Sequence, residues 1–344
     1  MVLRPETISS TNPFSSPSVR ERLRNSGLVL PVTYLVNRID IGTVTVRLLV
    51  ARVSDAGLEP LAKGYAICNL GQDVDATGVL REDAMQRVAD AVSGFLAQRD
   101  ALPGGKDIPT VCVATSASRD AANGGVFRAK IEALGVRLAI VPGEREAALS
   151  FAGASLDFPG RPVVVVDVGG GSTEIIAGMG GADPVLAHSF NIGCRRVTER
   201  FLHTNPPTPE ELTAAAVWMS GEMEPYLTQV REAGFGGAKV VAVAGTATSV
   251  VSIHKEMAVY DSAQVHGFPV SQEILQAVLD RLTALPLEDR RCVVGLDPRR
   301  ADVIVGGLLV LVCVLRLLGA HGFTASENDL LQGGVLALSR GELR

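Results

Sequence analysis

The chain has 344 residues, of which 47% are hydrophobic and 20% are charged, so it can bury a large core and is expected to hold two domains. Its net charge of −5 argues against a protein that binds nucleic acid through a broad basic surface. A narrow cleft inside an acidic protein can still be locally positive, so the composition does not exclude a small polyanionic ligand.

Residues 1–30 differ in composition from the rest of the chain. Ser, Pro, Asn and Arg are frequent there, and the apolar segment of a signal peptide or membrane anchor is missing. We therefore predict a disordered tail. The longest apolar run, from Val303 to Leu315, is shorter than the roughly 20 residues that span a bilayer. It predicts a buried helix and no association with a membrane.

The regular elements alternate along the chain as in an α/β protein with mixed sheets. Apolar and β-branched runs predict strands over 32–39, 44–53, 110–114, 137–141, 163–168, 173–177 and 239–243. Helical spacing of apolar residues predicts helices over 81–98, 119–133, 144–153, 193–202, 208–231, 271–284 and 300–318. The five cysteines show no Cys-x-x-Cys pair and no histidine at ligand spacing, which is typical of buried thiols in a reducing cytosol.

The first two predicted strands are joined by a turn with an acidic residue, a glycine and a hydroxyl group. The turn reads Asp40-Ile41-Gly42-Thr43, and an extended run follows it directly. One Asp-x-Gly-Thr turn is a weak signal of a phosphate loop. A second turn of the same kind makes the signal much stronger and suggests a duplicated domain with a ligand cleft between the halves.

The second turn follows the strand predicted over 163–168 and reads Asp167-Val168-Gly169-Gly170-Gly171-Ser172-Thr173-Glu174. Three glycines let backbone N–H groups approach an anion closely. The carboxylates of Asp167 and Glu174 could hold a divalent cation against the same anion. No lysine follows as in a Walker loop, and the next glycines come too soon for the helix of a dinucleotide-binding turn. A phosphate loop with a metal at its edge is favoured over an ordinary glycine-rich hairpin.

Both turns resemble the phosphate loops of the actin, sugar-kinase and Hsp70 superfamily. Four further segments resemble motifs of the exopolyphosphatase and guanosine pentaphosphate phosphohydrolase family: residues 115–123, 142–147, 244–248 and 326–329. The resemblance extends from about Thr33 to Leu338 and is strongest to short, actinobacterial-type members. It implies two ribonuclease-H-like lobes with mixed sheets around an interdomain cleft. The lobes are expected over 31–143, completed by 325–344, and over 144–324. It also implies a homodimer.

The resemblance implies a Mg²⁺-dependent hydrolase that releases terminal phosphate from inorganic polyphosphate. Glu146, in a segment similar to the family's Gly-x-x-Glu-Ala motif, would be the general base that activates water. Arg119 would clamp the phosphate chain with its planar guanidinium. Asp167 and Glu174 would position Mg²⁺, with Asp40 joining directly or through water. The residues implied in binding substrate are Gly42, Thr43, Gly169, Gly170, Gly171, Ser172 and Thr173, together with Gly245 and Thr246 in a loop that lines the cleft.

The chain departs from the family pattern at several positions. Val44 stands where the first loop usually has Asn, and Asn37-Arg38 interrupt a strand that is usually apolar. Asn69 and Gln332 also replace residues common in the family. The departures leave room for a specialised enzyme, or for a non-catalytic sensor of polyphosphate or an alarmone. Guanosine pentaphosphate stays open as the substrate, whereas Glu146 argues against a kinase, because kinases of this superfamily usually present Asp.

Overall fold

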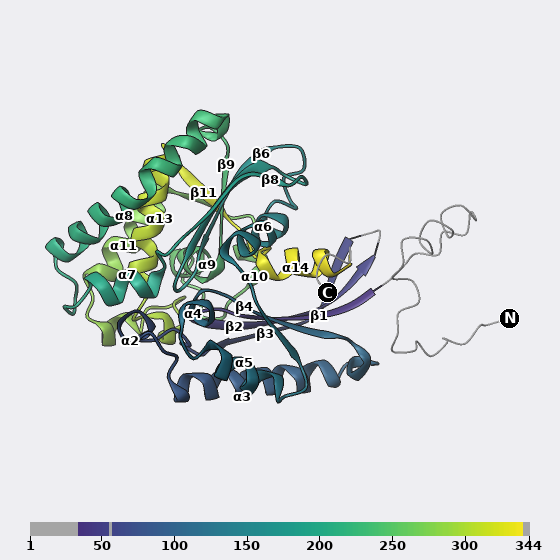
Figure 1. Ribbon diagram of the computed structural model, residues 1–344. Coiled ribbons are helices and arrows are strands. Elements are labelled where there is room, and N and C mark those ends of the chain that lie inside the picture. Colours follow the sequence, from purple (N-terminus) through teal and green to yellow (C-terminus); the bar gives the residue numbers. More distant parts are fainter. Residues whose placement is uncertain (1–33, 55–56, 340–344) are drawn as a thin grey trace.

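The computed structural model describes residues 34–54 and 57–339, which fold into two α/β lobes (Figure 1). The tail predicted over residues 1–30 lies outside the described residues. Within them, no helix is both long and apolar enough to cross a membrane. Four of the cysteines are buried, and Cys292 is exposed. The predicted fold class, two lobes with mixed sheets around a cleft, is confirmed.

The first lobe is built on a five-stranded sheet in the order β3-β2-β1-β4-β5. Its first three strands are antiparallel neighbours, and the last two run parallel to β1. Alternate residues of β2 face α3 on one side and α14 on the other. The elements are β1 (Tyr34–Ile41), β2 (Thr45–Ser54), β3 (Gly57–Ile67), α2 (Val74–Thr77), α3 (Glu82–Asp100), η1 (Gly105–Asp107), β4 (Thr110–Ala114), α4 (Ser116–Asp120), α5 (Gly124–Glu132) and β5 (Arg137–Ile140).

The second lobe repeats this order with one strand added, β10-β11-β9-β6-β7-β8. Again a three-stranded antiparallel meander lies beside parallel strands. Its large core packs helices α8, α9, α11 and α13 on one face of the sheet. The elements are β6 (Pro162–Val168), β7 (Thr173–Met179), β8 (Pro184–Phe190), α7 (Cys194–Phe201), α8 (Pro209–Val230), η2 (Arg231–Phe235), β9 (Lys239–Val243), α9 (Ala244–His254), α10 (Ser262–Val265), β10 (Pro269–Ser271), α11 (Gln272–Thr283), α12 (Leu287–Arg290), η3 (Pro298–Arg300), α13 (Ile304–Leu318) and β11 (Gly322–Ala325).

Two helices, α6 (Gly143–Ala154) and α14 (Leu330–Ser339), lie between the sheets (Figure 1). They touch backbone to backbone at glycines. A Cβ atom on Gly153 would lie 1.9 Å from the carbonyl oxygen of Asp329, and one on Gly333 would lie 1.8 Å from that of Leu149. Helix α6 packs on the second sheet, and α14 packs on β1 and β2 of the first. The pair therefore connects the lobes beneath the cleft.

The predicted strands are all present, and the predicted helices need two corrections. The helix expected over 119–133 is wrong as a single element, because Ala121 is extended and separates α4 from α5. The helix expected over 300–318 begins at Ile304, after a short 3-10 turn. Strands β3, β8, β10 and β11 were not predicted. The loop expected at 244–248 is the first turn of α9, since β9 continues directly into that helix.

Candidate active site

The two predicted phosphate loops have the same turn geometry. The amide of Gly42 donates to the carbonyl of Thr45 at 2.9 Å, and that of Gly169 donates to Ser172 at 3.0 Å. In each turn a Cβ on the glycine would lie 3.1 Å from the accepting oxygen. Both turns therefore have a tightly packed glycine at the same place, as expected of a duplicated hairpin.

The tips of the two loops are in contact. A Cβ on Gly170 would lie 2.7 Å from the Cβ of Thr43, and one on Gly171 would lie 2.6 Å from the Oγ of Ser116. The cavity between them has a volume of about 10 Å³, which is room for about one water. The structure thus brings the predicted phosphate-binding residues together in a closed arrangement. Thr173 lies deeper, where its hydroxyl donates to the carbonyl of Ile192 at 2.5 Å.

Acidic residues gather behind the loops. Asp167 and Glu174 face each other across β6 and β7, and Asp40 holds the matching position at the end of β1. Asp167 accepts a hydrogen bond from Ser150 of α6, and Glu174 accepts one from Ser189 at 2.6 Å. Each of the three carboxylates is buried.

Burial and mutual repulsion raise the pKa values of these acids. Burial, and then the charge of Asp329, raises the pKa of Asp167 to about 6. Burial, and then Asp167, raises the pKa of Glu174 to about 8. Glu146 is also buried, and burial followed by the charges of Glu174, Asp167 and Asp40 holds its pKa well above the usual range. The structure therefore places the predicted base within the field of the predicted metal ligands.

Arg119 and Glu146 lie side by side at one edge of the first sheet. Parallel strands β4 and β5 end there, so the segments that follow them, α4 and α6, begin next to each other. The Nη1 atom of Arg119 is 3.5 Å from the Oε2 of Glu146, and it donates to the carbonyl of Val141 at 3.1 Å. The guanidinium favours the ionised form of Glu146.

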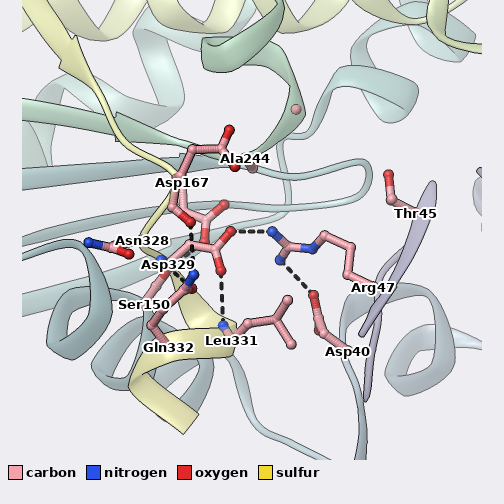
Figure 2. Close-up of polar contacts among 12 residues, drawn as sticks. Asp40, Thr45, Arg47, Ser150, Asp167, Ala244, Asn328, Asp329, Leu331 and Gln332 are labelled. Atoms are coloured by element: carbon pink, nitrogen blue, oxygen red, sulfur yellow. Dashed lines mark hydrogen bonds and ion pairs between the residues drawn. The ribbon is translucent and has the colours of Figure 1, made fainter. Parts of the chain in front are cut away.

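Two charged residues of the site did not emerge from the sequence as site residues, Arg47 and Asp329 (Figure 2). Arg47 donates to the Oδ2 of Asp40 at 2.7 Å and also pairs with Asp329. Asp329 precedes α14 and accepts from the amide of Leu331 at 2.9 Å. A signal for Arg47 exists, since it pairs with Asp40 across β1 and β2 as Glu174 pairs with Asp167. The correspondence is not evident in the sequence, because the first hairpin has arginine at this position and the second has glutamate.

The departures from the family pattern have places in this structure. Val44 packs against Cys194 and Val303 of the second lobe. The guanidinium of Arg38 is fully buried and has no hydrogen-bond partner among the described residues, and burial lowers its pKa to about 10. It fits because the facing helix residue is Gly334, where a Cβ would lie 1.6 Å from Nη1. Gln332 accepts from the amide before α14, that of Asp329, at 3.0 Å.

The acidic set suits Mg²⁺ in its chemistry. All the donors are carboxylate oxygens, which hard cations prefer, and the Oδ1 of Asp40 is buried with no partner in the part of the chain that the structure describes. No group of three His, Cys, Asp or Glu side chains within residues 34–54 and 57–339 is placed to hold a metal unaided. Mg²⁺ usually takes one or two carboxylates and completes its shell with water and substrate phosphates. Asp167, Glu174 and Asp40 therefore fit a cation that is bound together with its substrate.

Gly245 and Thr246 separate in the structure. Gly245 borders a large cavity between the lobes, where a Cβ on it would lie 1.9 Å from the Nη1 of Arg300. Thr246 is buried and packs against Gly307 of α13, away from that cavity. Only Gly245 is thus placed to line the cleft.

The large cavity has a volume of about 710 Å³ and takes its walls from both lobes. Arg300 lies over the ring of Tyr65, 5.6 Å from its centre, and donates to the hydroxyl of Thr45 at 3.0 Å. In the described chain Arg300 has no carboxylate partner. Two other arginines of the wall are paired, Arg47 with Asp329 and Arg299 with Asp297. The wall is otherwise formed mainly by apolar and aromatic side chains, including Leu48, Met257, Tyr260 and Leu296.

Comparisons with known proteins find relatives that cover most of this chain. Residues 49–338 match the model of the Ppx/GppA phosphatase family. The chain is 37% identical over 322 residues to exopolyphosphatase 2 of Mycobacterium tuberculosis, covering 88% of this chain and 98% of that protein. It is 28% identical to the guanosine-5′-triphosphate,3′-diphosphate pyrophosphatase of Photobacterium profundum, covering 89% of this chain and 59% of that protein. The crystal structure of an exopolyphosphatase-like protein superposes with a TM-score of 0.81 at 34% identity, covering 91% of this chain and 99% of that one.

Proposed function

The chain belongs to the Ppx/GppA phosphatase family, and from this premise we propose that it removes terminal orthophosphate from inorganic polyphosphate with Glu146 as general base. One observation carries the proposal. The buried Glu146 has a raised pKa, and it lies beside Arg119 and near the acids that flank the two phosphate-type loops. This constellation is what in-line hydrolysis of a phosphoanhydride needs.

The reaction follows from these positions. A water held by Glu146 attacks the terminal phosphorus, and its proton passes to the carboxylate. The bond to the bridging oxygen breaks, and that oxygen leaves as the new end of the shortened chain. Arg119 would bind the phosphate oxygens through its fork of N–H donors. Mg²⁺, held by Asp167, Glu174 and Asp40, would neutralise charge on the phosphate oxygens.

The pKa of Glu146 fits its proposed role. A general base is most effective when its pKa lies near the working pH. A glutamate with the usual pKa would be a weak proton acceptor at neutral pH. Burial raises the pKa, while the neighbouring Arg119 preserves part of the ionised form.

Replacing the base tests the proposal. For Glu146→Gln we expect a loss of kcat of about 100-fold or more, because a neutral amide cannot accept the proton. Glu144→Gln is the matched control, since Glu144 is exposed on the first turn of the same helix. Phosphate release from long-chain polyphosphate, measured beside the thermal unfolding of each variant, separates catalysis from folding. Near wild-type release by Glu146→Gln would remove the glutamate from the mechanism.

A second candidate substrate, guanosine pentaphosphate, is supported by the 710 Å³ cavity. A polyphosphate chain has no apolar surface, whereas this wall offers two tyrosine rings, apolar side chains and few unpaired cations. A nucleoside could occupy it while its phosphates reach the loops. Tyr65→Leu then raises KM for guanosine pentaphosphate and leaves KM for polyphosphate unchanged. Equal effects on both substrates would argue against a nucleoside site. The homodimer and the cytoplasmic location stay predictions.

A further inference from the structure

Helix α7 joins the second phosphate loop to the first lobe. Its first amides bind the loop itself, since Cys194 donates to the carbonyl of Gly169 and Arg195 to that of Gly170, each at 2.9 Å. A Cβ on Gly193 would lie 2.3 Å from the carbonyl oxygen of Gly170. The helix and the loop are therefore one packed unit, and any motion of the loop moves α7 with it.

The guanidinium of Arg196 holds this unit to the opposite lobe. Its Nε donates to the carbonyl of Gly171 at 3.0 Å, within the second loop. Its two terminal nitrogens lie 2.8 Å from Asp75 and 3.0 Å from Asp120, which belong to α2 and α4 of the first lobe. One side chain thus joins loop and lobe through three acceptors.

Arg195 makes a second set of contacts across the same boundary. Its side chain is buried, with 5% of the residue exposed, and its Nη2 donates to Asn69 of the first lobe at 2.6 Å. Glu199 of the same helix accepts from the amide of Asp73 at 3.3 Å. The Nε of Arg195 is buried and has no hydrogen-bond partner within residues 34–54 and 57–339. Arg195 and Arg196 line the small cavity between the loops together with Thr43 and Gly170.

These contacts keep the loops shut. Because Gly170 rests on Thr43, a phosphate group cannot reach the amides of both loops until the tips separate. Separation moves α7 away from the first lobe, and Arg196 must then leave either Gly171 or its two carboxylates. Asp75 and Asp120 are 34% and 29% exposed, so water can solvate both once they are released.

We propose that Arg195 and Arg196 form an anion-exchange latch, in which phosphates of the substrate replace Asp75, Asp120 and Asn69 as acceptors. The proposal rests on the proposed function, because it assumes a phosphoanhydride at these loops. A guanidinium fork matches phosphate as well as carboxylate, and a terminal phosphate carries a charge of about −1.5 to −2 near pH 7, more than a carboxylate. The exchange leaves every cation paired, so the substrate itself opens the site. Arg195 and Arg196 are thereby substrate-binding residues that the closed structure shows with placeholder acceptors.

The test compares the two sides of the latch by binding rather than turnover. In the Glu146→Gln background, the dissociation constant of inorganic tripolyphosphate with Mg²⁺ is measured by calorimetry. Asp75→Asn with Asp120→Asn should lower it by about tenfold, and Arg196→Ala should raise it by about tenfold, each close to one charge-assisted hydrogen bond. Arg196→Lys, which keeps the charge but lacks the planar fork of donors, should fall between wild type and alanine. Asp90→Asn on the exposed face of α3 is the control for charge alone.

Opposite shifts in the two dissociation constants, with faster hydrogen exchange over 169–172 in both the double asparagine variant and Arg196→Ala, support the latch. If both changes weaken binding, the cluster is only structural; if both tighten it, Arg196 does not bind phosphate. Unchanged hydrogen exchange over 169–172 in the double variant would mean that its substitutions change the dissociation constant only through surface charge. Each of these three results overturns the proposal. A wild-type protein that neither binds nor hydrolyses polyphosphate would instead count against the proposed function.

Discussion

At the scale of single residues, the proposed active site contains buried charges of both signs that compensate one another. Asp40, Asp167, Glu174 and Glu146 repel one another, and they are compensated by arginines from different elements. Arg47 is the most constrained of these, since it bridges Asp40 and Asp329 from the middle of the cluster (Figure 2). The arrangement makes single substitutions expensive in stability as well as in activity.

Arg47→Ala should be strongly destabilising. It leaves two acids that are 5% and 4% exposed without their cation, and an uncompensated buried charge costs about 3–5 kcal/mol. Arg52→Ala is the matched control on the same strand, because the pair of Arg52 with Glu59 is exposed and contributes about 0–1 kcal/mol. Urea unfolding gives both values. A similar small loss for the two variants would show that Arg47 is not the counter-ion of the site.

Protons and Mg²⁺ should compete for the acids. The pKa values of Asp167 and Glu174 are raised to about 6 and about 8, so the folded metal-free protein binds protons more tightly than the unfolded chain. The contribution of these two acids to stability is then fully present below about pH 4 and is lost as the pH rises through 6 to 8. Mg²⁺ should restore stability at the higher pH.

Calorimetric titration of Mg²⁺ in two buffers of different ionisation enthalpy, across that pH window, reports the protons released on binding. We expect release below the raised pKa values and an affinity for Mg²⁺ that increases with pH. Binding without proton release, and a melting temperature that does not depend on pH, would contradict the assignment of these acids as ligands.

At the scale of elements, the connection between the lobes depends on glycines. Helices α6 and α14 touch at Gly153 and Gly333, where no side chain fits. Glu146 lies on α6, and Asp329 directly precedes α14. The spacing of the two helices therefore sets how the proposed base, Glu146, faces the acids of the two hairpins.

Gly153→Ala should weaken the molecule and its activity together. The new Cβ would lie 1.9 Å from the backbone of Asp329, so the helices must separate, at a cost of about 1–3 kcal/mol. Gly94→Ala, within helix α3, adds the same atom where nothing lies within 4 Å and should stabilise by up to about 1 kcal/mol. Thermal unfolding and phosphate release of the two variants are compared. A stabilised Gly153→Ala would mean that the helices are not in backbone contact.

The sequence predicts the inner strands of the two sheets better than the strands and helices at their edges. Strand β3 escaped prediction because it contains Pro60 and Gly64, which an edge strand tolerates and a central strand does not. Helix α9 escaped because β9 runs into it at Ala244, whose φ of 66° lets the chain turn without a linker. The break at Ala121 brings Gly124 close to the carbonyl of Ser118, a local backbone contact that the spacing of apolar residues does not show.

At the scale of the whole molecule, two lobes of the same strand order present matching hairpins to one cleft (Figure 1). The two turns in the sequence were sufficient to predict a duplicated domain with a cleft between its halves, since each turn follows an apolar run and contains a glycine at the same place. The closed state was not predictable, because it depends on Arg196 meeting Asp75 and Asp120, which are distant in the chain. The large cavity likewise comes from residues of both lobes.

The most direct test of a terminal phosphoanhydride hydrolase is Mg²⁺-dependent phosphate release by the wild-type protein. Long-chain polyphosphate, guanosine pentaphosphate and ATP are compared in parallel, and the polyphosphate products are sized. We predict orthophosphate from polyphosphate or from guanosine pentaphosphate, little from ATP, and chains that shorten from their ends without fragments of intermediate length. Release from neither of the first two substrates, or release from ATP at an equal rate, would contradict the account.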